Sequence, residues 1–218
     1  MTSQFTLVVG NKNYSSWSLR GFLAARAAGI TFHEVLVRLS EPGSKKQLLN
    51  HSPAGKVPVL KHGERVVWDS LAIIEYLAEI RPDAALWPAD AAARAHARSI
   101  AAEMHAGFPA LRSHMPMNLR KSLPGKGRGR EVEADIERIL AIWRDCRARY
   151  GARGHFLFGP FGAADAIYTP VATRFHTYAV ELDDISQHYV DAVLARPDFL
   201  EWHEAALEEP WVIAEDEV

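Results

Sequence analysis

The sequence predicts two domains, a small α/β domain followed by an all-helical domain. Two observations predict this arrangement. Strand-like and helix-like patterns alternate over residues 1–80, whereas the apolar residues recur with a helical period over residues 91–218. Residues 81–90 contain two prolines between these regions, so we expect a linker there.

The first domain is expected to follow the order β-α-β-α-β-β-α. The expected elements are a strand at 5–9, a helix at 16–28, a strand at 33–39, a short helix at 44–50, strands at 57–60 and 66–68, and a helix that starts after Asp69. Gly29 suits the position just beyond the first helix. This order of elements is that of the thioredoxin-like fold.

The second domain is expected to be a helical bundle. The expected helices are a long one at 91–114, a second at 131–150, and two or more over 163–179 and 186–208. Pro116 is expected to end or kink the first. Gly162 and Asp165 form half of a capping box, because glycine is an acceptable N-cap and Asp165 can accept from its N–H.

Composition limits the classes of function. The chain has 218 residues, 48% hydrophobic, and a formal net charge of −2, which gives no general attraction to nucleic acid. The basic stretch 120–130 contains Gly and Pro and is expected to be a solvated loop. Cys146 is the only cysteine, so an intrachain disulfide or dithiol redox site is excluded. No apolar run approaches the ~20 residues of a membrane span, and a cytoplasmic location is expected.

Residues 52–77, SPAGKVPVLKHGERVVWDSLAIIEYL, carry the clearest binding pattern. Pro58 stands at a strand entrance, where it leaves a ladder position open. If the Val57–Pro58 bond is cis, the Val57 backbone groups face solvent. Asp69 is a good N-cap, and the N–H groups beyond it form a carboxylate site. The stretch therefore suits a small peptide with a free carboxylate.

SPAGKVPVL followed by DSLAIIEYL resembles the glutathione-binding half of a cytosolic glutathione transferase. The resemblance implies that Val57 and Pro58 meet the cysteinyl backbone of glutathione. It implies that Asp69 and Ser70 hold the γ-glutamyl end. It also implies glutathione as co-substrate, a homodimer and a role in detoxification.

SSWSLR, residues 15–20, resembles the SSCSWR signature of zeta-class transferases, in which the first serine activates the thiol. Ser15 is therefore the predicted catalytic residue, with Ser16 beside glutathione. Lowering a thiol pKa by about two units needs roughly 2.7 kcal/mol, and one hydrogen bond to a charged group supplies about 1.5–3 kcal/mol. Two alternatives stay open. Ser15 or Ser16 could simply cap the helix, and Tyr14 could be the activating residue, as tyrosine is in other classes.

Other candidate residues follow from the resemblance. Lys45, slightly preferred over Lys56, would pair with the glycyl carboxylate. The second-substrate pocket would be lined by Tyr14, His105, Phe108, Arg112 and Met115. Arg112 could recognise an acidic substrate, although apolar residues at helical spacing are as often simply core. No metal is expected, since the histidines at 96, 105 and 114 face alternate sides of a helix.

The predicted function is a glutathione transferase that activates the thiolate for attack on a small electrophile. One alternative is a glutathione-dependent isomerase resembling maleylacetoacetate isomerase, or a peroxidase. Trp17 replaces the zeta-class cysteine, which speaks against the isomerase. Another alternative is a non-catalytic protein that binds glutathione. The residues do not identify the electrophile.

Overall fold

A four-stranded sheet forms the centre of the first domain in the computed structural model, which describes residues 4–218. The strands are β1 (Phe5–Val9), β2 (Phe32–Leu36), β3 (Val59–His62) and β4 (Arg65–Trp68). Their order is β2-β1-β3-β4, with β2 parallel to β1 and the other two pairs antiparallel. The thioredoxin-like prediction is confirmed.

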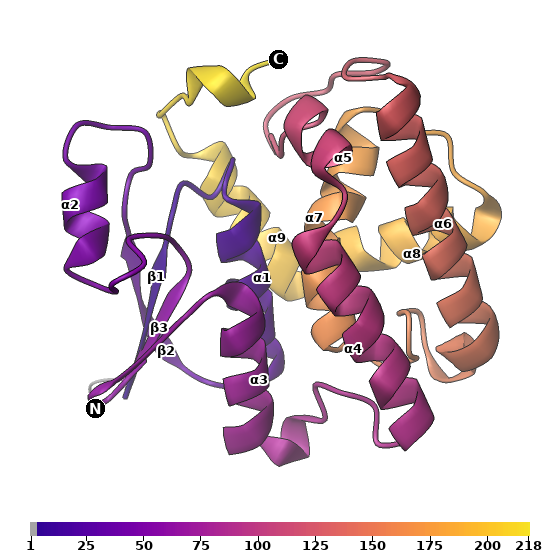
Figure 1. Ribbon diagram of the computed structural model, residues 1–218, viewed down its shortest axis with the longest axis horizontal. Coiled ribbons are helices and arrows are strands. Elements are labelled where there is room, and N and C mark those ends of the chain that lie inside the picture. The colour runs from indigo at the N-terminus through magenta and orange to yellow at the C-terminus, as the bar shows by residue number, and fades with distance from the viewer. Residues whose placement is uncertain (1–3) are drawn as a thin grey trace.

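Side chains that alternate along the strands separate the two faces of this sheet. Leu7 and Leu60 pack in the large core with α1 and α3, whereas Val8 and Val59 pack with Leu48 of α2. Figure 1 shows α2 on the outer face of the sheet and α1 and α3 on the face toward the second domain. The helices are α1 (Ser16–Ala27), α2 (Ser44–Leu49) and α3 (Ser70–Ile80).

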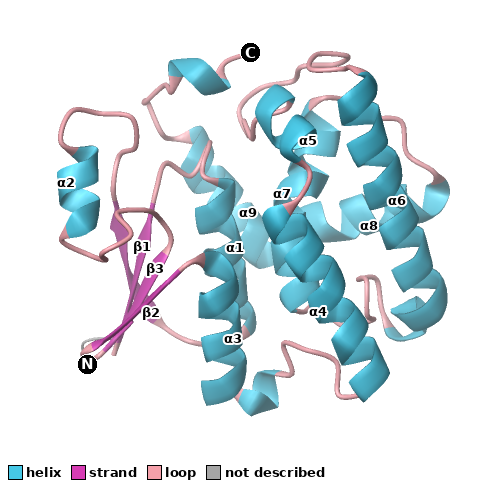
Figure 2. Ribbon diagram, viewed as in Figure 1, coloured by secondary structure: helices cyan, strands magenta, loops and turns pink. Residues whose placement is uncertain are grey.

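The second domain is helical, as Figure 2 shows. Its helices are α4 (Ala91–Ala106), α5 (Pro109–His114), α6 (Arg130–Tyr150), α7 (Ala163–Thr177), α8 (Asp184–Leu194) and α9 (Pro197–Leu207). Helix α7 is buried along almost its whole length and packs against α1, α4 and α8. It therefore holds the two domains together. Within residues 4–218, no helix is both long and apolar enough to span a membrane.

Several predicted boundaries were wrong for identifiable reasons. The helix expected at 91–114 is two helices, because Gly107 is extended and Phe108 has a φ of 57° before Pro109 starts α5. The prediction of two or more helices over 163–179 and 186–208 holds: there are three, α7, α8 and α9, since Pro197 starts α9. Strand β3 begins after Pro58, and β2 ends at Leu36 rather than at residue 39.

Two structural predictions for the second domain are confirmed. The N–H of Gly162 donates to Asp165 Oδ2 at 2.9 Å, and the N–H of Leu157 donates to Oδ1 at 3.0 Å. Cys146 is fully buried, and burial raises the pKa of its thiol to about 12. It is a core residue without reactivity at neutral pH.

Candidate functional site

Ser15 lies at the turn that leads from β1 into α1, where it is the N-cap. Its Oγ accepts from the Ser18 N–H at 3.3 Å and lies 2.8 Å from Ser18 Oγ, to which it donates. The capping role left open for Ser15 is therefore real. It does not exclude a second role, because Ser15 also lines a cavity between the two domains.

This cavity has a volume of about 540 Å³, which is in the range of small-molecule sites. Its walls come from both domains and from the C-terminal segment. It is lined by Tyr14, Ser15, Ser16, Trp17, Leu39, Ser40, Leu48, Gly55, Lys56, Val57, Pro109, Arg112, Ser113, Pro116, Met117, Arg174, Ile213 and Asp216. A ligand in this cavity would contact the first turn of α1 and the loop that precedes β3.

The predicted backbone-binding position has the expected geometry. The Val57–Pro58 peptide bond is cis, and Val57 lines the cavity. The backbone N–H and C=O of Val57 make no hydrogen bond within residues 4–218. These groups are open to an extended peptide backbone.

The start of α3 offers a second polar position. Asp69 is its N-cap, and Oδ1 accepts from the N–H of Leu71 at 2.8 Å and of Ala72 at 3.4 Å. Ser70 Oγ is buried and has no hydrogen-bond partner among the described residues. A buried hydroxyl without a partner is costly, and a ligand carboxylate would satisfy it.

The two lysine candidates differ in position. Lys45 does not line the cavity, and its Nζ donates to the carbonyls of Ala54 at 3.2 Å and Gly55 at 3.1 Å. Lys56 lines the cavity wall beside Val57. The structure thus places the less favoured lysine at the cavity.

The predicted second-substrate residues separate into two groups. Tyr14 and Arg112 line the cavity, whereas Phe108 and Met115 are buried in the core. His105 does not line it either. Its Nε2 lies 3.3 Å from Asp69 Oδ2, and its ring packs edge-on against Trp17 at 5.2 Å. His105 therefore contacts Asp69 and Trp17 without lining the cavity itself.

Sequence reasoning missed two buried arginines, Arg20 and Arg174, that lie close enough to the predicted Arg112 to interact with its charge. Two guanidinium groups lie over the Trp17 ring, that of Arg20 at 4.3 Å and that of Arg112 at 4.9 Å from the ring centroid. Arg20 is buried, and its Nε and Nη1 have no partner among the described residues. Arg174 lines the cavity from α7, and its Nε donates to the Met115 carbonyl at 2.7 Å.

Arg112 and Arg174 bring positive charge to the wall of the cavity. Burial, together with the repulsion of the neighbouring arginines, lowers the pKa of Arg20 to about 9 and of Arg174 to about 10. Both therefore stay protonated at neutral pH. Asp216 also lines the cavity and attracts Arg174, whereas Arg112 pairs with no carboxylate among the described residues, so the cavity favours a ligand anion beside Arg112. In the sequence, the only indication of this positive charge is that Arg20 is the last residue of the SSWSLR motif.

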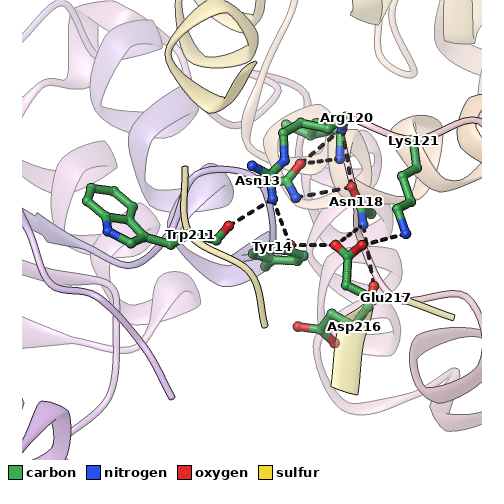
Figure 3. A network of polar contacts seen from close by, with 9 residues as sticks. Asn13, Tyr14, Asn118, Arg120, Lys121, Trp211, Asp216 and Glu217 are labelled. Atoms are coloured by element: carbon green, nitrogen blue, oxygen red, sulfur yellow. Dashed lines mark hydrogen bonds and ion pairs between the residues drawn. The ribbon is translucent and has the colours of Figure 1, made fainter. Parts of the chain in front are cut away.

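A second missed feature is the C-terminal strap, which we define as residues 209–217. Ile213 and Asp216 of the strap line the cavity. Arg120, predicted to be part of a solvated loop, instead donates to the carbonyls of Glu209 and of Trp211, the latter at 2.8 Å. Arg120 thus ties the strap to the helical domain, as Figure 3 shows at Trp211.

The end of the strap is fixed through Glu217. Glu217 Oε1 accepts from the Tyr14 hydroxyl at 2.5 Å and from Asn118 Nδ2 at 2.8 Å, and Oε2 pairs with Lys121 (Figure 3). Arg120 Nη2 donates to Tyr14 Oη at 2.8 Å. Burial and the bond to Glu217 raise the pKa of Tyr14. The Tyr14 hydroxyl already donates its proton to the Glu217 carboxylate, which argues against Tyr14 as the residue that activates the thiol.

Comparisons with known proteins agree with this geometry. The family model for the N-terminal domain of glutathione S-transferase matches residues 14–80, and the model for the C-terminal domain matches residues 127–205. Over 96 residues the chain is 40% identical to a probable maleylacetoacetate isomerase of Caenorhabditis elegans. That stretch is 44% of this chain and 44% of the relative, so less than half of the relative's length is matched.

Two solved structures share the whole fold. A glutathione transferase homologue from Burkholderia, solved with bound glutathione, has a TM-score of 0.71 at 24% identity, covering 93% of this chain and 97% of that chain. A zeta-class bacterial maleyl pyruvate isomerase has a TM-score of 0.71 at 22% identity, covering 94% and 98%. At these identities the likeness concerns the fold.

Proposed function

Because the chain belongs to the glutathione S-transferase family, we propose that it activates glutathione and joins it to a small electrophile that carries a carboxylate. The observation that carries this proposal is the pairing of two features in one cavity. The Ser15 hydroxyl lies at the start of α1, and the guanidinium groups of Arg112 and Arg174 line the same space. The first suits a thiolate, and the second suits an acid.

In this proposal glutathione lies along the first domain. The Val57 backbone pairs with the cysteinyl unit beside Pro58, and Asp69 and Ser70 hold the γ-glutamyl end. The unpaired Ser70 hydroxyl and the unpaired Val57 backbone groups support this placement. Lys56 takes the glycyl carboxylate in preference to Lys45, because Lys56 lines the cavity.

The chemistry needs the thiolate of glutathione. The thiol proton passes to solvent, and the Ser15 hydroxyl donates a hydrogen bond to the sulfur anion, which lowers the thiol pKa. The sulfur then attacks the electrophilic carbon, a C–S bond forms, and the leaving group departs with its electron pair. Ser16 stands beside glutathione at the first position of α1.

A glutathione-dependent isomerase is the second candidate, favoured by the 40% identity to a probable maleylacetoacetate isomerase. In such a reaction the thiolate adds to a conjugated cis double bond, the new single bond rotates, and the thiolate leaves again. Glutathione is regenerated, so its consumption separates the two candidates. A homodimer and a cytoplasmic detoxification role complete the proposal.

Ser15→Ala tests the proposed function. We expect the pKa of the bound thiol to rise by about one to two units, the loss of a hydrogen bond of ~1.5–3 kcal/mol. At pH 7 conjugation should slow roughly 10- to 100-fold, and the defect should shrink as pH rises. Thiolate absorbance against pH and single-turnover rates give these values.

Ser16→Ala and Tyr14→Phe are the comparison variants. A normal thiol pKa in Ser15→Ala, with a large rise in either of the other two, would move the activating role to that residue. Calorimetry with glutathione and with S-methylglutathione tests the binding site itself. Absence of millimolar or tighter binding of both would contradict the proposed function altogether.

A further inference from the structure

A second buried hydroxyl lies directly behind Ser15. Ser18 is fully buried on the first turn of α1, and its Oγ is 2.8 Å from Ser15 Oγ. The same Oγ accepts from the backbone N–H of Gly10, at the end of β1, at 2.9 Å. The Ser18 N–H also donates to Ser15 Oγ at 3.3 Å. Ser18 thus contacts Ser15 through both its backbone and its side chain.

The proton count of this pair allows two arrangements. Each serine has one hydroxyl proton. In the structure the Ser15 hydroxyl donates to Ser18 Oγ, which then accepts two hydrogen bonds. Among the described residues, Ser18 Oγ makes hydrogen bonds with the Gly10 N–H and with Ser15 Oγ. The Gly10 N–H cannot accept, so the Ser18 hydroxyl can donate only to Ser15 Oγ. Rotation of both hydroxyls therefore reverses the bond and leaves the Ser15 proton free.

We propose that Ser18 is a positioning residue that frees and orients the Ser15 hydroxyl for the glutathione thiolate. The proposal rests on the proposed role of Ser15. When the anion is present, Ser15 donates to sulfur, Ser18 donates to Ser15, and the Gly10 N–H donates to Ser18. No proton leaves any serine. All the donors then point along one chain toward the negative charge.

Such a chain stabilises the anion more than a lone hydroxyl does. Hydrogen bonds in series polarise one another, and the strengthening is of order 10–30% per bond. Ser15 Oγ also receives the Ser18 N–H, which holds the oxygen in place. Because Ser15 and Ser18 are both buried, a water molecule cannot easily take the place of the Ser18 hydroxyl. The predicted effect of Ser18 therefore passes entirely through Ser15.

A double-mutant cycle on the full-length protein tests this dependence. Ser18→Ala should raise the pKa of bound glutathione by about 0.3–0.7 unit and slow conjugation about two- to fivefold below that pKa. In a Ser15→Ala background the same change should have no further effect on the pKa. Equal shifts in the two backgrounds, or no shift with Ser15 intact, would overturn the proposal. No shift in Ser15→Ala alone would instead overturn the proposed role of Ser15.

The chain offers a matched control in α8. Ser186 is also fully buried at the third helical position, and its N–H and Oγ both donate to the N-cap side chain of Asp183, at 2.9 and 3.0 Å. Ser186→Ala removes an equivalent hydroxyl from a helix that does not line the cavity. Ser186→Ala should lower the melting temperature, as we also expect of Ser18→Ala, and should leave the thiol pKa unchanged.

A measurement on the unmutated protein keeps the proposal testable if Ser18→Ala fails to fold. The Gly10 amide donates to the last member of the chain, so its NMR shift should titrate with the bound glutathione thiol. S-methylglutathione, which has no ionisable thiol, should give no such titration. A Gly10 amide that responds identically to both ligands over the pH range would contradict the chain.

Discussion

Arg112 is the residue through which selection among electrophiles can be tested most directly. Its side chain lines the cavity, and apart from a 3.4 Å contact with the Gly107 carbonyl it makes no hydrogen bond within residues 4–218. Arg174 is less suitable, because its Nε and Nη1 hold the Met115 and Pro170 carbonyls and its removal would disturb the core. Arg112 is therefore free to bind a ligand carboxylate.

We expect Arg112→Met to reduce kcat/KM for 4-chloro-3-nitrobenzoate about 10- to 100-fold, the cost of a charged hydrogen bond of ~1.5–3 kcal/mol. The methyl ester of this compound lacks the charge and should change less than threefold. Rates are divided by the uncatalysed rate of each compound with glutathione. The comparison variant is Arg144→Met, which removes an exposed arginine paired with Asp183 outside the cavity. Equal losses for acid and ester would refute acid recognition by Arg112.

The buried carboxyl of Asp165 is expected to make the stability of the fold depend on pH. Burial raises its pKa to about 6, and the hydrogen bonds from Leu157 and Gly162 only partly oppose this. The folded pKa lies above the unfolded value, so the fold binds the proton more tightly than the unfolded chain does. This contribution to stability is complete below pH ~4 and is lost as pH rises through 6.

For Asp165→Asn we therefore expect a stability penalty that shrinks with rising pH, by on the order of 2 kcal/mol between pH 4 and pH 8. The penalty itself arises because the amide has one acceptor oxygen for two backbone N–H groups. Urea unfolding of the two proteins at each pH measures it. A penalty that is constant or grows with pH would show that the carboxyl is ionised throughout.

At the scale of elements, a few polar contacts attach the C-terminal strap to the rest of the protein. Burial acts to raise the pKa of Glu217, but hydrogen bonds from Lys121, Tyr14 and Asn118 outweigh it and lower the pKa. A lowered carboxylate pKa stabilises the fold above the ordinary value near 4.5 and ceases to do so as pH falls through the folded value. The strap is therefore tied down at neutral pH and loosened by acid.

Glu217→Gln should speed amide hydrogen exchange of residues 209–217 about 5- to 30-fold at pH 7, which corresponds to ~1–2 kcal/mol for a partly exposed ion pair with its hydrogen bonds. Exchange in α7 should not change. The variant and the original protein should converge as pH falls through the lowered pKa of Glu217, where its carboxyl becomes protonated. Glu208→Gln, an exposed carboxylate just before the strap, is the control. Undiminished protection in Glu217→Gln would show that the other contacts of the strap, such as those of Arg120, hold it without Glu217.

The sequence predicted those parts of the molecule that depend on local signals. Ser15 and Asp69 are both helix N-caps, and their type and spacing indicate this directly. The break before Pro109 was also present in the sequence and was overlooked. Arg174 and the strap could not have been found, because Tyr14 and Glu217 are 203 residues apart and nothing local predicts their contact. The cavity is a product of packing between distant segments.

At the scale of the whole molecule, the exposed face of the first domain is the place to test assembly. Strand β4 is an edge strand, and Trp68 on it is 44% exposed, with Val66 nearby at 36%. A tryptophan on an open edge favours association, which charged residues usually prevent. We expect this face to take part in the homodimer.

Light scattering at micromolar concentration should accordingly give twice the 24.3 kDa mass of one chain. Trp68→Glu should shift the protein toward monomer, because it removes an aromatic side chain from the expected interface and introduces a negative charge there. Ile185→Glu makes the same kind of change at a 43% exposed residue of α8, a helix of the second domain, and should leave the mass unchanged. The dimer would be disproved by a single-chain mass for the original protein. A dimer that survives Trp68→Glu as well as it survives Ile185→Glu would place the interface elsewhere.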